Sequence, residues 1–300
     1  MKVFVTGATG FVGSAVVQEL IKAGHQVLGL THSDTGAKSL AAAGAKVHRG
    51  DVEDLDSLRR GVAASGGVIH TAFNHDFSKF EANCEKDRRA IEALGSALAG
   101  SDRPLIITSA IGVLPPGGLA TEETMPASGP TPNPRAASEV AADTVATRGV
   151  SVSVVRLGAS VHGDGDHAFV PMLIKIARKK GVSVYQGDGL NRWPAVHRLD
   201  AAHLFRLALE KKAPAAGTRF HGVAEEGVAF REIAEVIGKR LNIPVVSKSP
   251  EEAAEHFGSF AHFAAMDNPA SSAQTQELLG WKPQQPGLIV DLDRERYFTT

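Results

Sequence analysis

The chain opens with the stretch Val3-Phe4-Val5-Thr6-Gly7-Ala8-Thr9-Gly10-Phe11-Val12-Gly13. Its apolar start predicts a short buried strand, and the residues that follow, 12–23, have the apolar spacing of an amphipathic helix. The glycines between them fit the pattern G-x-x-G-x-x-G. In such a loop the first glycine permits a tight turn, the second lets backbone N–H groups approach a pyrophosphate, and the third allows close helix packing. The stretch therefore predicts a dinucleotide site at the amino end of a helix.

Strands and helices alternate through the first half of the chain beyond this loop. Each predicted strand is short and almost wholly apolar, which suits burial on both faces. The predicted strands are 3–6, 26–31, 46–49, 67–71, 105–109 and 152–157. The predicted helices are 12–23, 37–43, 57–63, 84–99, 138–148, 198–210, 230–241, 251–257 and 274–279. This order predicts an α/β protein with a Rossmann doubly wound parallel sheet and a smaller C-terminal substrate-binding lobe.

We expect the NADP-binding Rossmann domain to span residues 1–158, with a returning segment at about 195–221 and at least one more strand. Residues 159–300 are expected to form mainly the substrate-binding lobe. Proline and glycine are concentrated over residues 114–134, which predicts a long surface loop. The run Arg178-Lys179-Lys180 before Gly181 predicts the carboxyl end of a helix, where cations are favourable.

Composition sets limits on the class of protein. Apolar residues make up 43% of the 300 residues, and the net charge of −1 gives no reason to expect nucleic acid or a membrane as partner. The single cysteine, Cys84, excludes an internal disulfide. No signal-peptide pattern precedes the first strand, so we expect a cytoplasmic protein. We further expect a small-molecule substrate, no bound metal, and a monomer or homodimer.

The end of the second predicted strand informs the choice of cofactor. An NAD-binding unit has an acid here for the ribose hydroxyls, but this chain has Thr31-His32-Ser33, and Asp34 comes too late. A carboxylate would repel a 2′-phosphate, whereas hydroxyls and an imidazole can donate hydrogen bonds to it. The arginine usual in NADP-binding units is missing here, and a polar turn is the alternative interpretation. The pattern favours NADP(H).

Residues after the third and fourth predicted strands complete the expected cofactor site. Asp51-Val52 would sit at the adenine edge, and Thr71-Ala72-Phe73 would line the middle of the cofactor. Phe73 is also a candidate for an apolar wall of the substrate pocket, with core packing as the alternative interpretation.

Further motifs carry a resemblance over nearly the whole chain. They are Gly50-Asp51-Val52, Val68-Ile69-His70-Thr71-Ala72, Ile107-Thr108-Ser109, Arg156-Leu157-Gly158-Ala159-Ser160-Val161-His162-Gly163, Val196-His197-Arg198-Leu199-Asp200 and Glu277-Leu278-Leu279-Gly280-Trp281-Lys282-Pro283. With the glycine loop they resemble an extended or atypical short-chain dehydrogenase/reductase of the NAD(P)-dependent epimerase/dehydratase-like group. The resemblance implies that the C-terminal lobe binds substrate over the nicotinamide, and that Leu157 and Ala159 contact the cofactor.

The chain departs from this family in its catalytic motif. Relatives carry Tyr-x-x-x-Lys, but neither Tyr185 nor Tyr297 has a lysine four residues later. The resemblance aligns Asn133 with the tyrosine and Ala137 with the lysine, and neither can replace its counterpart. It places the family's serine or threonine at Ser109, or one residue later, and matches the family's active-site asparagine with Asp87. Ser109 and Asp87 are therefore candidate catalytic residues.

Other residues were weighed singly. His162 and His167 bracket Gly163-Asp164-Gly165, in the region where relatives contact substrate, and a turn-stabilising role is the alternative. His162 is also a candidate proton donor, because a histidine titrates near neutrality. Phe169 and Trp193 are candidates for the substrate pocket wall, with core packing as the alternative.

Two functional hypotheses follow from these patterns. The first is an NADP(H)-dependent oxidoreductase that reduces a small ketone or quinone by hydride transfer without the Tyr-x-x-x-Lys pair, or a sugar epimerase or dehydratase. The second is a non-catalytic NADP(H)-binding sensor that kept the fold and lost the chemistry.

Overall fold

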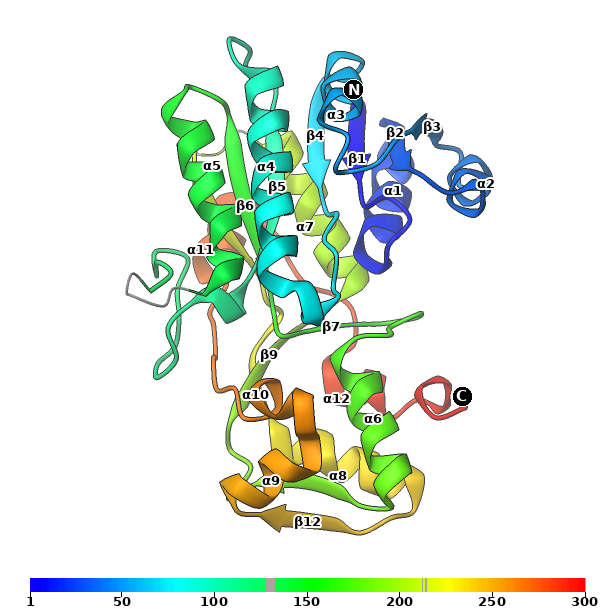
Figure 1. Cartoon of the computed structure of the whole chain (residues 1–300), viewed down its shortest axis with the longest axis vertical. Helices are drawn as coiled ribbons and strands as arrows, with labels where there is room; N and C mark the ends of the chain where they lie inside the picture. The colour runs from blue at the N-terminus through cyan, green and yellow to red at the C-terminus, as the bar shows by residue number, and fades with distance from the viewer. Residues whose placement is uncertain (128–132, 212, 214, 300) are drawn as a thin grey trace.

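The computed structural model describes residues 1–127, 133–211, 213 and 215–299. Part of the predicted loop 114–134 therefore lies outside the described residues. Figure 1 shows a larger lobe, which contains the first half of the chain and the later helices Arg198–Glu210 and Ala273–Leu279, above a smaller lobe built from other parts of the second half. None of the described helices combines the length and apolarity needed to cross a membrane.

Seven parallel strands form the sheet of the larger lobe, in the order β10-β6-β5-β4-β1-β2-β3. They are β1 (Lys2–Thr6), β2 (Gln26–Thr31), β3 (Lys46–Arg49), β4 (Gly67–His70), β5 (Leu105–Ala110), β6 (Val152–Leu157) and β10 (Thr218–Gly222). Strands β1 to β6 have the order of a doubly wound Rossmann sheet, so the predicted fold class is confirmed. β10 extends the sheet beyond β6 and supplies the strand expected from the later part of the chain.

Side chains of β1 show why this strand is an unbroken apolar run. Val3 and Val5 pack into the core on one face of the sheet, whereas Phe4 packs into the core on the other. All three are fully buried. A parallel strand covered on both faces needs apolar residues at every position, not at alternate ones.

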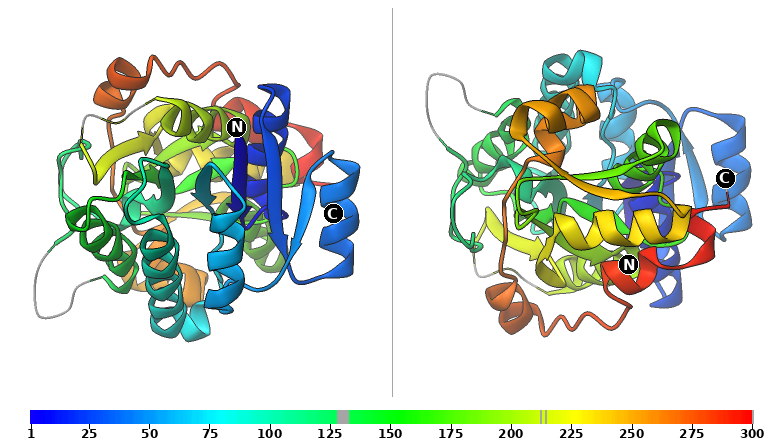
Figure 2. Two further views of the ribbon diagram at one scale, coloured as in Figure 1. Left: turned by 90° about the horizontal axis from the view of Figure 1, so that it is seen from above. Right: turned by 90° about the horizontal axis from the view of Figure 1, so that it is seen from below.

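Helices cover both faces of the sheet, as the view from above in Figure 2 shows. α1 and α7 pack together on one face, with α2 beside them, and α3, α4 and α5 cover the other. Their bounds are α1 (Phe11–Lys22), α2 (Asp34–Ala42), α3 (Leu55–Ala63), α4 (Phe80–Leu98), α5 (Ala137–Thr147) and α7 (Arg198–Glu210). The predicted and observed ends of these helices differ most at α4, which begins four residues earlier than expected.

The smaller lobe lies beyond the carboxyl ends of the large sheet's strands (Figure 1). It holds a three-stranded sheet, β11-β9-β7, and a two-stranded sheet, β12-β8. The strands are β7 (Ser160–His162), β8 (Ser183–Gln186), β9 (Arg192–His197), β11 (Glu225–Ala229) and β12 (Val245–Lys248). The helices are α6 (Phe169–Lys180), α8 (Phe230–Leu241), α9 (Pro250–Phe257), α10 (Ala261–Ala264) and α12 (Leu288–Leu292). Gly181 ends α6 in the left-handed region, at φ +68°, as the preceding basic run predicted.

One aspartate ties the end of the chain to the larger lobe. Asp200, in the first turn of α7, is 4% exposed. Its two carboxylate oxygens accept hydrogen bonds from the backbone N–H groups of Gln284 and Gln285, at 3.0 and 2.9 Å. Its carbonyl accepts the indole N–H of the buried Trp281, at 3.0 Å. The helix that closes the larger lobe therefore also fixes the path of the C-terminal segment, which continues into α12.

We predict that Asp200→Ala lowers the free energy of unfolding by about 1–3 kcal/mol, because two backbone donors lose their acceptor at a buried carboxylate. Urea denaturation followed by circular dichroism measures the change. The matched control is Asp102→Ala, an exposed aspartate, which should shift stability by no more than about 0.5 kcal/mol. Equal effects of the two substitutions would contradict the structural role given to Asp200.

Candidate active site

Two of the three loop glycines are required by backbone packing. Gly7 has φ +64°, and a Cβ atom there would lie 2.6 Å from the backbone nitrogen of Ala72. A Cβ atom on Gly13 would lie 2.0 Å from the carbonyl oxygen of Gly7. α1 can therefore pack this closely on β1 only with glycine at position 13, and the turn can approach the end of β4 only with glycine at position 7.

Gly10 differs from the other two glycines because its space is open. It is exposed, and a Cβ atom there would meet only the Gly7 carbonyl oxygen, at 3.2 Å. It stands at the N-cap of α1, where no side chain caps the helix. The first N–H groups of α1, on Phe11 and Val12, have no acceptor among the described residues. An open glycine before uncapped helix N–H groups fits the pyrophosphate of a dinucleotide.

The expected adenosine end of the site lies at the carboxyl ends of β2 and β3. Thr31 is buried, and Ser33 caps α2 by accepting the N–H of Gly36, at 3.0 Å. His32 is exposed, with its Nδ1 atom 3.6 Å from a carboxylate oxygen of Asp51. Thr9 is exposed and Val52 half-buried near the same edge. These polar groups therefore lie together, as their positions after the strands predicted.

Arg49 is a member of this cluster that sequence reasoning missed. The parallel register of β2 and β3 pairs Thr31 with Arg49. The Arg49 guanidinium forms an ion pair with Asp34 and donates a hydrogen bond to the carbonyl of His32, at 3.4 Å. The neighbouring strand therefore brings an arginine to the end of β2. Strand register, which the sequence pattern did not give, was the information needed to find it.

A buried hydrogen-bonded chain lies beyond the glycine loop, at the ends of β1 and β4. The hydroxyl of Thr6 is 2.7 Å from Nδ1 of His70, and Nε2 of His70 is 2.9 Å from Asp87 on α4. Asp87 also contacts Arg135 and Ser138, at 2.9 and 2.5 Å. Burial opposes ionisation of Asp87, but Arg135 and the hydrogen bonds from His70 and Ser138 outweigh it and lower the pKa of Asp87. Asp87 is therefore a carboxylate in the folded protein.

Arg135 occupies the segment that aligns with the missing Tyr-x-x-x-Lys motif. It belongs to the 3-10 helix Pro134–Ala136, directly before α5, and its side chain is 11% exposed. Its guanidinium lies 4.2 Å above the ring of Phe73 and donates to the carbonyl of Thr108 at the end of β5, at 2.9 Å. Asn133, which aligns with the tyrosine, is exposed and donates to the carbonyl of Gly112 at 3.0 Å.

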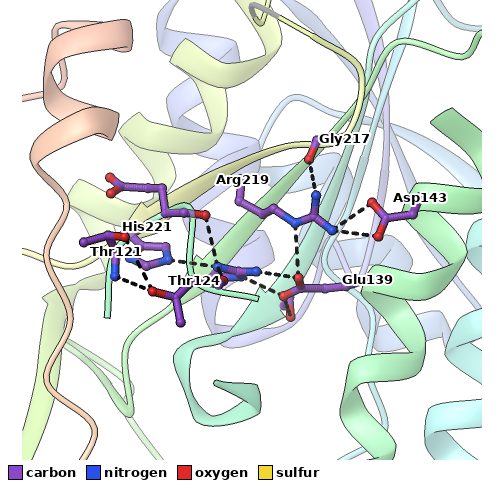
Figure 3. Close-up of polar contacts among 10 residues, drawn as sticks. Thr121, Thr124, Glu139, Asp143, Gly217, Arg219 and His221 are labelled. Atoms are coloured by element: carbon purple, nitrogen blue, oxygen red, sulfur yellow. Dashed lines mark hydrogen bonds and ion pairs between the residues drawn. The ribbon is translucent and has the colours of Figure 1, made fainter. Parts of the chain in front are cut away.

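Ser109 points into a different network from Asp87. It is 2% exposed, and its hydroxyl donates to Glu139 on α5, at 2.8 Å. Glu139 forms a two-point ion pair with the fully buried Arg156, at 2.8 and 2.7 Å. Figure 3 shows how Glu139 also meets Arg219 and how the network reaches His221 and Thr124. In this conformation the Ser109 hydroxyl is directed to Glu139, and its expected catalytic role stays a prediction.

His162 is likewise enclosed rather than presented to a substrate. It is 1% exposed, with Nδ1 3.0 Å from Asp291 of α12 and its ring 5.3 Å from that of His197. Burial opposes ionisation of Asp291, but His162 and Arg296 outweigh it and lower the pKa of Asp291 to about 2. Tyr297 donates to the same carboxylate at 3.2 Å. The structure holds His162 in a buried pair with Asp291, and its expected roles toward substrate and in proton transfer stay predictions.

Other predicted residues do lie together between the lobes. His167 is exposed, and its ring is 5.8 Å from that of Phe11 at the start of α1. Phe169 packs against Trp193 at 5.8 Å, and Trp193 is fully buried, so only Phe169 retains exposed surface. Thr71 anchors the approach to Phe73 by donating to the Thr6 carbonyl at 2.8 Å. Leu157 and Ala159 flank Gly158 at the end of β6, Leu157 buried and Ala159 half-buried.

Aromatic side chains from both lobes meet at this junction, and the sequence did not single out three of them. Phe77, from the segment after β4, lies 5.2 Å from Phe263 of α10, ring centre to ring centre. Phe263 in turn lies 4.7 Å from Phe169, and Phe80 lies 6.3 Å from Phe73. Phe77 is 40% exposed. Aromatic side chains from both lobes therefore form one partly exposed apolar cluster at the junction.

Comparison with known proteins agrees with this architecture. Residues 3–221 match the NAD dependent epimerase/dehydratase family. The chain is 53% identical over 298 residues to the uncharacterized protein C2A9.02 of Schizosaccharomyces pombe, covering 99% of this chain and 100% of that protein. It is 28% identical to a UDP-glucose 4-epimerase of Streptomyces lividans, over 97% of this chain and 94% of that one. It is 29% identical to a 2-alkyl-3-oxoalkanoate reductase of Stenotrophomonas maltophilia, over 83% of this chain and 78% of that one.

Solved structures extend the same likeness to the whole chain. MoeE5 in complex with UDP-glucose and NAD superposes with a TM-score of 0.74 at 21% identity, covering 97% of this chain and 96% of that one. The chain therefore belongs to the NAD dependent epimerase/dehydratase family, which places it among the extended short-chain dehydrogenases/reductases. The resemblance found in the sequence motifs is confirmed.

We predict that Gly10→Val abolishes NADPH binding but changes the free energy of unfolding by no more than about 1 kcal/mol, because position 10 meets little of the protein itself. Gly13→Ala should lower both the affinity for NADPH and the free energy of unfolding, because its Cβ atom would collide with the backbone of Gly7. Titration of NADPH fluorescence and thermal unfolding measure the two effects. Gly118→Val, at an exposed position with nothing within 4 Å, is the control and should alter neither. Undiminished NADPH binding by Gly10→Val would refute this assignment of the loop.

Proposed function

We propose that this protein is an NADP(H)-dependent oxidoreductase that reduces the carbonyl group of a small ketone or quinone without a Tyr-x-x-x-Lys pair. One observation carries the proposal. The open glycine loop lies next to the junction of the lobes. There Arg135, in the segment aligned with the catalytic motif, pairs with the buried Asp87 of α4, and that segment has no tyrosine. Residues suited to holding the cofactor are present in this proposal. The tyrosine that serves an epimerase as acid and base is missing from the aligned segment.

The proposed preference for NADP(H) rests on charge at the adenosine end. A 2′-phosphate needs a cation and hydrogen-bond donors, which Arg49, His32 and Thr31 would supply. Of the two carboxylates at this end, Asp34 is already paired with Arg49, and Asp51 lies beside His32. Arg49 is half exposed, so it can turn toward a phosphate without uncovering a buried charge.

The proposed substrate class rests on the surface at the junction. Phe73, Phe77 and Phe263 offer aromatic carbon from both lobes. A ketone or quinone joined to an apolar group suits such a surface better than a sugar with many hydroxyls. The likeness to a 2-alkyl-3-oxoalkanoate reductase supports this class.

In the proposed mechanism the glycine loop and the residues after β2, β3 and β4 would hold the cofactor, which supplies hydride when bound. Asp87 acts as a positioning residue, because it fixes Arg135 beside Phe73. We further propose that Ser109 and His162 support the site walls and do not transfer protons, because Glu139 and Asp291 engage them in buried pairs.

Sugar epimerase or dehydratase activity is the second candidate, and the likeness to UDP-glucose 4-epimerase favours it. A nucleotide diphosphate substrate needs cations in the smaller lobe. Arg192, at the start of β9, is held at two points by Asp267, at 3.0 and 3.1 Å, which leaves it less able to bind phosphate. A sensor that binds NADP(H) without turnover is the third candidate. A screen of ketones, quinones and UDP-sugars with NADPH and NADH separates the three.

We predict that the protein binds NADPH at least about tenfold more tightly than NADH, a difference of about 1.4 kcal/mol. Arg49→Ala should weaken NADPH binding at least about tenfold and leave NADH binding within about twofold. Isothermal titration calorimetry with both cofactors measures this. Arg59→Ala removes an arginine of similar exposure that pairs with Asp56 on α3, and should change neither affinity. Equal affinity of the unaltered protein for the two cofactors would defeat the proposal.

A further inference from the structure

We infer that Arg135 binds and polarises the carbonyl oxygen of the substrate, in the role for which relatives carry a tyrosine. The inference rests on the proposed reductase function and adds a catalytic group to it. It starts from the hydrogen-bonding capacity of the guanidinium. The arginine side chain has five N–H donors in a fixed plane and no hydrogen-bond acceptor.

Three protein groups hold the guanidinium of Arg135. Nη1 contacts Asp87 and the hydroxyl of Ser138, and Nη2 donates to the carbonyl of Thr108. The Nε–H group has no protein acceptor in the described part of the chain. This edge of the guanidinium can therefore hold an oxygen atom.

The position of Arg135 relative to the strands places this edge where the reaction is expected. The glycine loop follows β1, and the adenosine residues follow β2 and β3 on one side of it. The other end of a dinucleotide must therefore extend over the ends of β4 and β5. Nη2 of Arg135 donates to the carbonyl of Thr108, which is in β5. The guanidinium lies over the ring of Phe73, which follows β4.

Asp87 sets the orientation of the arginine without reaching the reacting atoms. Its carboxylate is 3% exposed and is bonded to His70 and Ser138 as well as Arg135. The guanidinium therefore keeps one plane, and its free edge is directed before the substrate arrives. Such preorganised donors stabilise a charge that develops during the reaction and need no rearrangement when it does.

The chemistry assigned to Arg135 is electrostatic, because an arginine does not give up its proton in a protein. Hydride with its electron pair forms a C–H bond at the carbonyl carbon, the C=O π bond breaks, and the oxygen becomes an alkoxide held by Arg135. The reduced cofactor is oxidised and the carbonyl is reduced. Water supplies the proton that converts the alkoxide to the alcohol.

His75, a titratable neighbour, does not take the place of water as the acid. Partial desolvation of the imidazole, together with the charges of Arg135 and His167, lowers the pKa of His75 below its usual value. Its imidazole is therefore neutral at pH 7. The ring lies 5.1 Å from that of Phe73, which adds to the aromatic surface. The substrate class is therefore a ketone or quinone with its oxygen on Arg135 and an aromatic or conjugated group along Phe73 and Phe77.

The test compares Arg135→Lys with Arg103→Lys, using the whole protein and any ketone that it reduces. Arg103 donates to the carbonyls of Val62, Ser65 and Ala97, next to the amino end of β5, far from the proposed site. Arg135→Lys should bind NADPH within about twofold of the unaltered protein and lose about 10²- to 10³-fold in kcat. Arg103→Lys should lower the melting temperature and keep kcat within about twofold.

The pH dependence gives a readout that a merely structural role would not move. In Arg135→Lys the charged form of the lysine is the active one, so kcat should fall as pH rises through the pKa of that lysine. In the unaltered protein the arginine stays charged and this loss should be absent. A kcat within about twofold of the unaltered protein, or the same pH profile in both proteins, would overturn the inference.

A second measurement needs no variant at this position. Benzoate carries an oxyanion on an aromatic ring, and benzamide is its neutral counterpart. With NADP⁺ bound, benzoate should inhibit competitively against the ketone at least about tenfold more strongly than benzamide. Equal inhibition would overturn the assignment of Arg135. If the protein binds NADPH but reduces no ketone or quinone, the proposed function itself has failed.

Discussion

Asp87, on α4, accepts hydrogen bonds from three side chains that come from two separate parts of the chain. His70 comes from the end of β4, Ser138 from α5, and Arg135 from the segment between the surface loop and α5. A buried carboxylate is stable only when its charge is compensated in this way. Loss of any one partner would leave charge or polar atoms unpaired beneath the candidate active site. The positions of Arg135, Phe73 and the residues after β4 therefore depend on this one group.

The same constraint accounts for how the chain departs from its family. A tyrosine and lysine pair would supply a hydroxyl acid and a cation from one helical segment. Here Asn133 and Ala137 stand at those positions, and the cation comes from Arg135 between them. An arginine brings charge and directed N–H groups but no transferable proton. Stabilisation of a carbonyl oxyanion by a fixed cation is the chemistry that we propose for this set of residues.

The sequence predicted the larger lobe well and the candidate site only in part. Strict glycine spacing and apolar strands predicted β1 to β6 because each depends on local patterns. The strands of the smaller lobe went unpredicted, since short edge strands such as β7 and β12 carry little periodic signal. Arg49 was missed because only the register of β2 and β3 brings it to Thr31. Ser109 could be aligned with a catalytic residue and His162 placed in the substrate region, but which way they point depends on tertiary partners, Glu139 and Asp291.

The fate of the cofactor's hydride tests the central claim most directly. The protein is incubated with NADPH that carries deuterium at C4 of the nicotinamide and with an aromatic ketone, and the products are analysed by mass spectrometry and proton NMR. A reductase of the proposed kind places one deuterium on the carbon that bore the carbonyl oxygen, with matching oxidation of the cofactor. Tight binding of labelled NADPH with no deuterium in any alcohol product, across a range of ketones and with both C4 hydrogens labelled, would contradict the account.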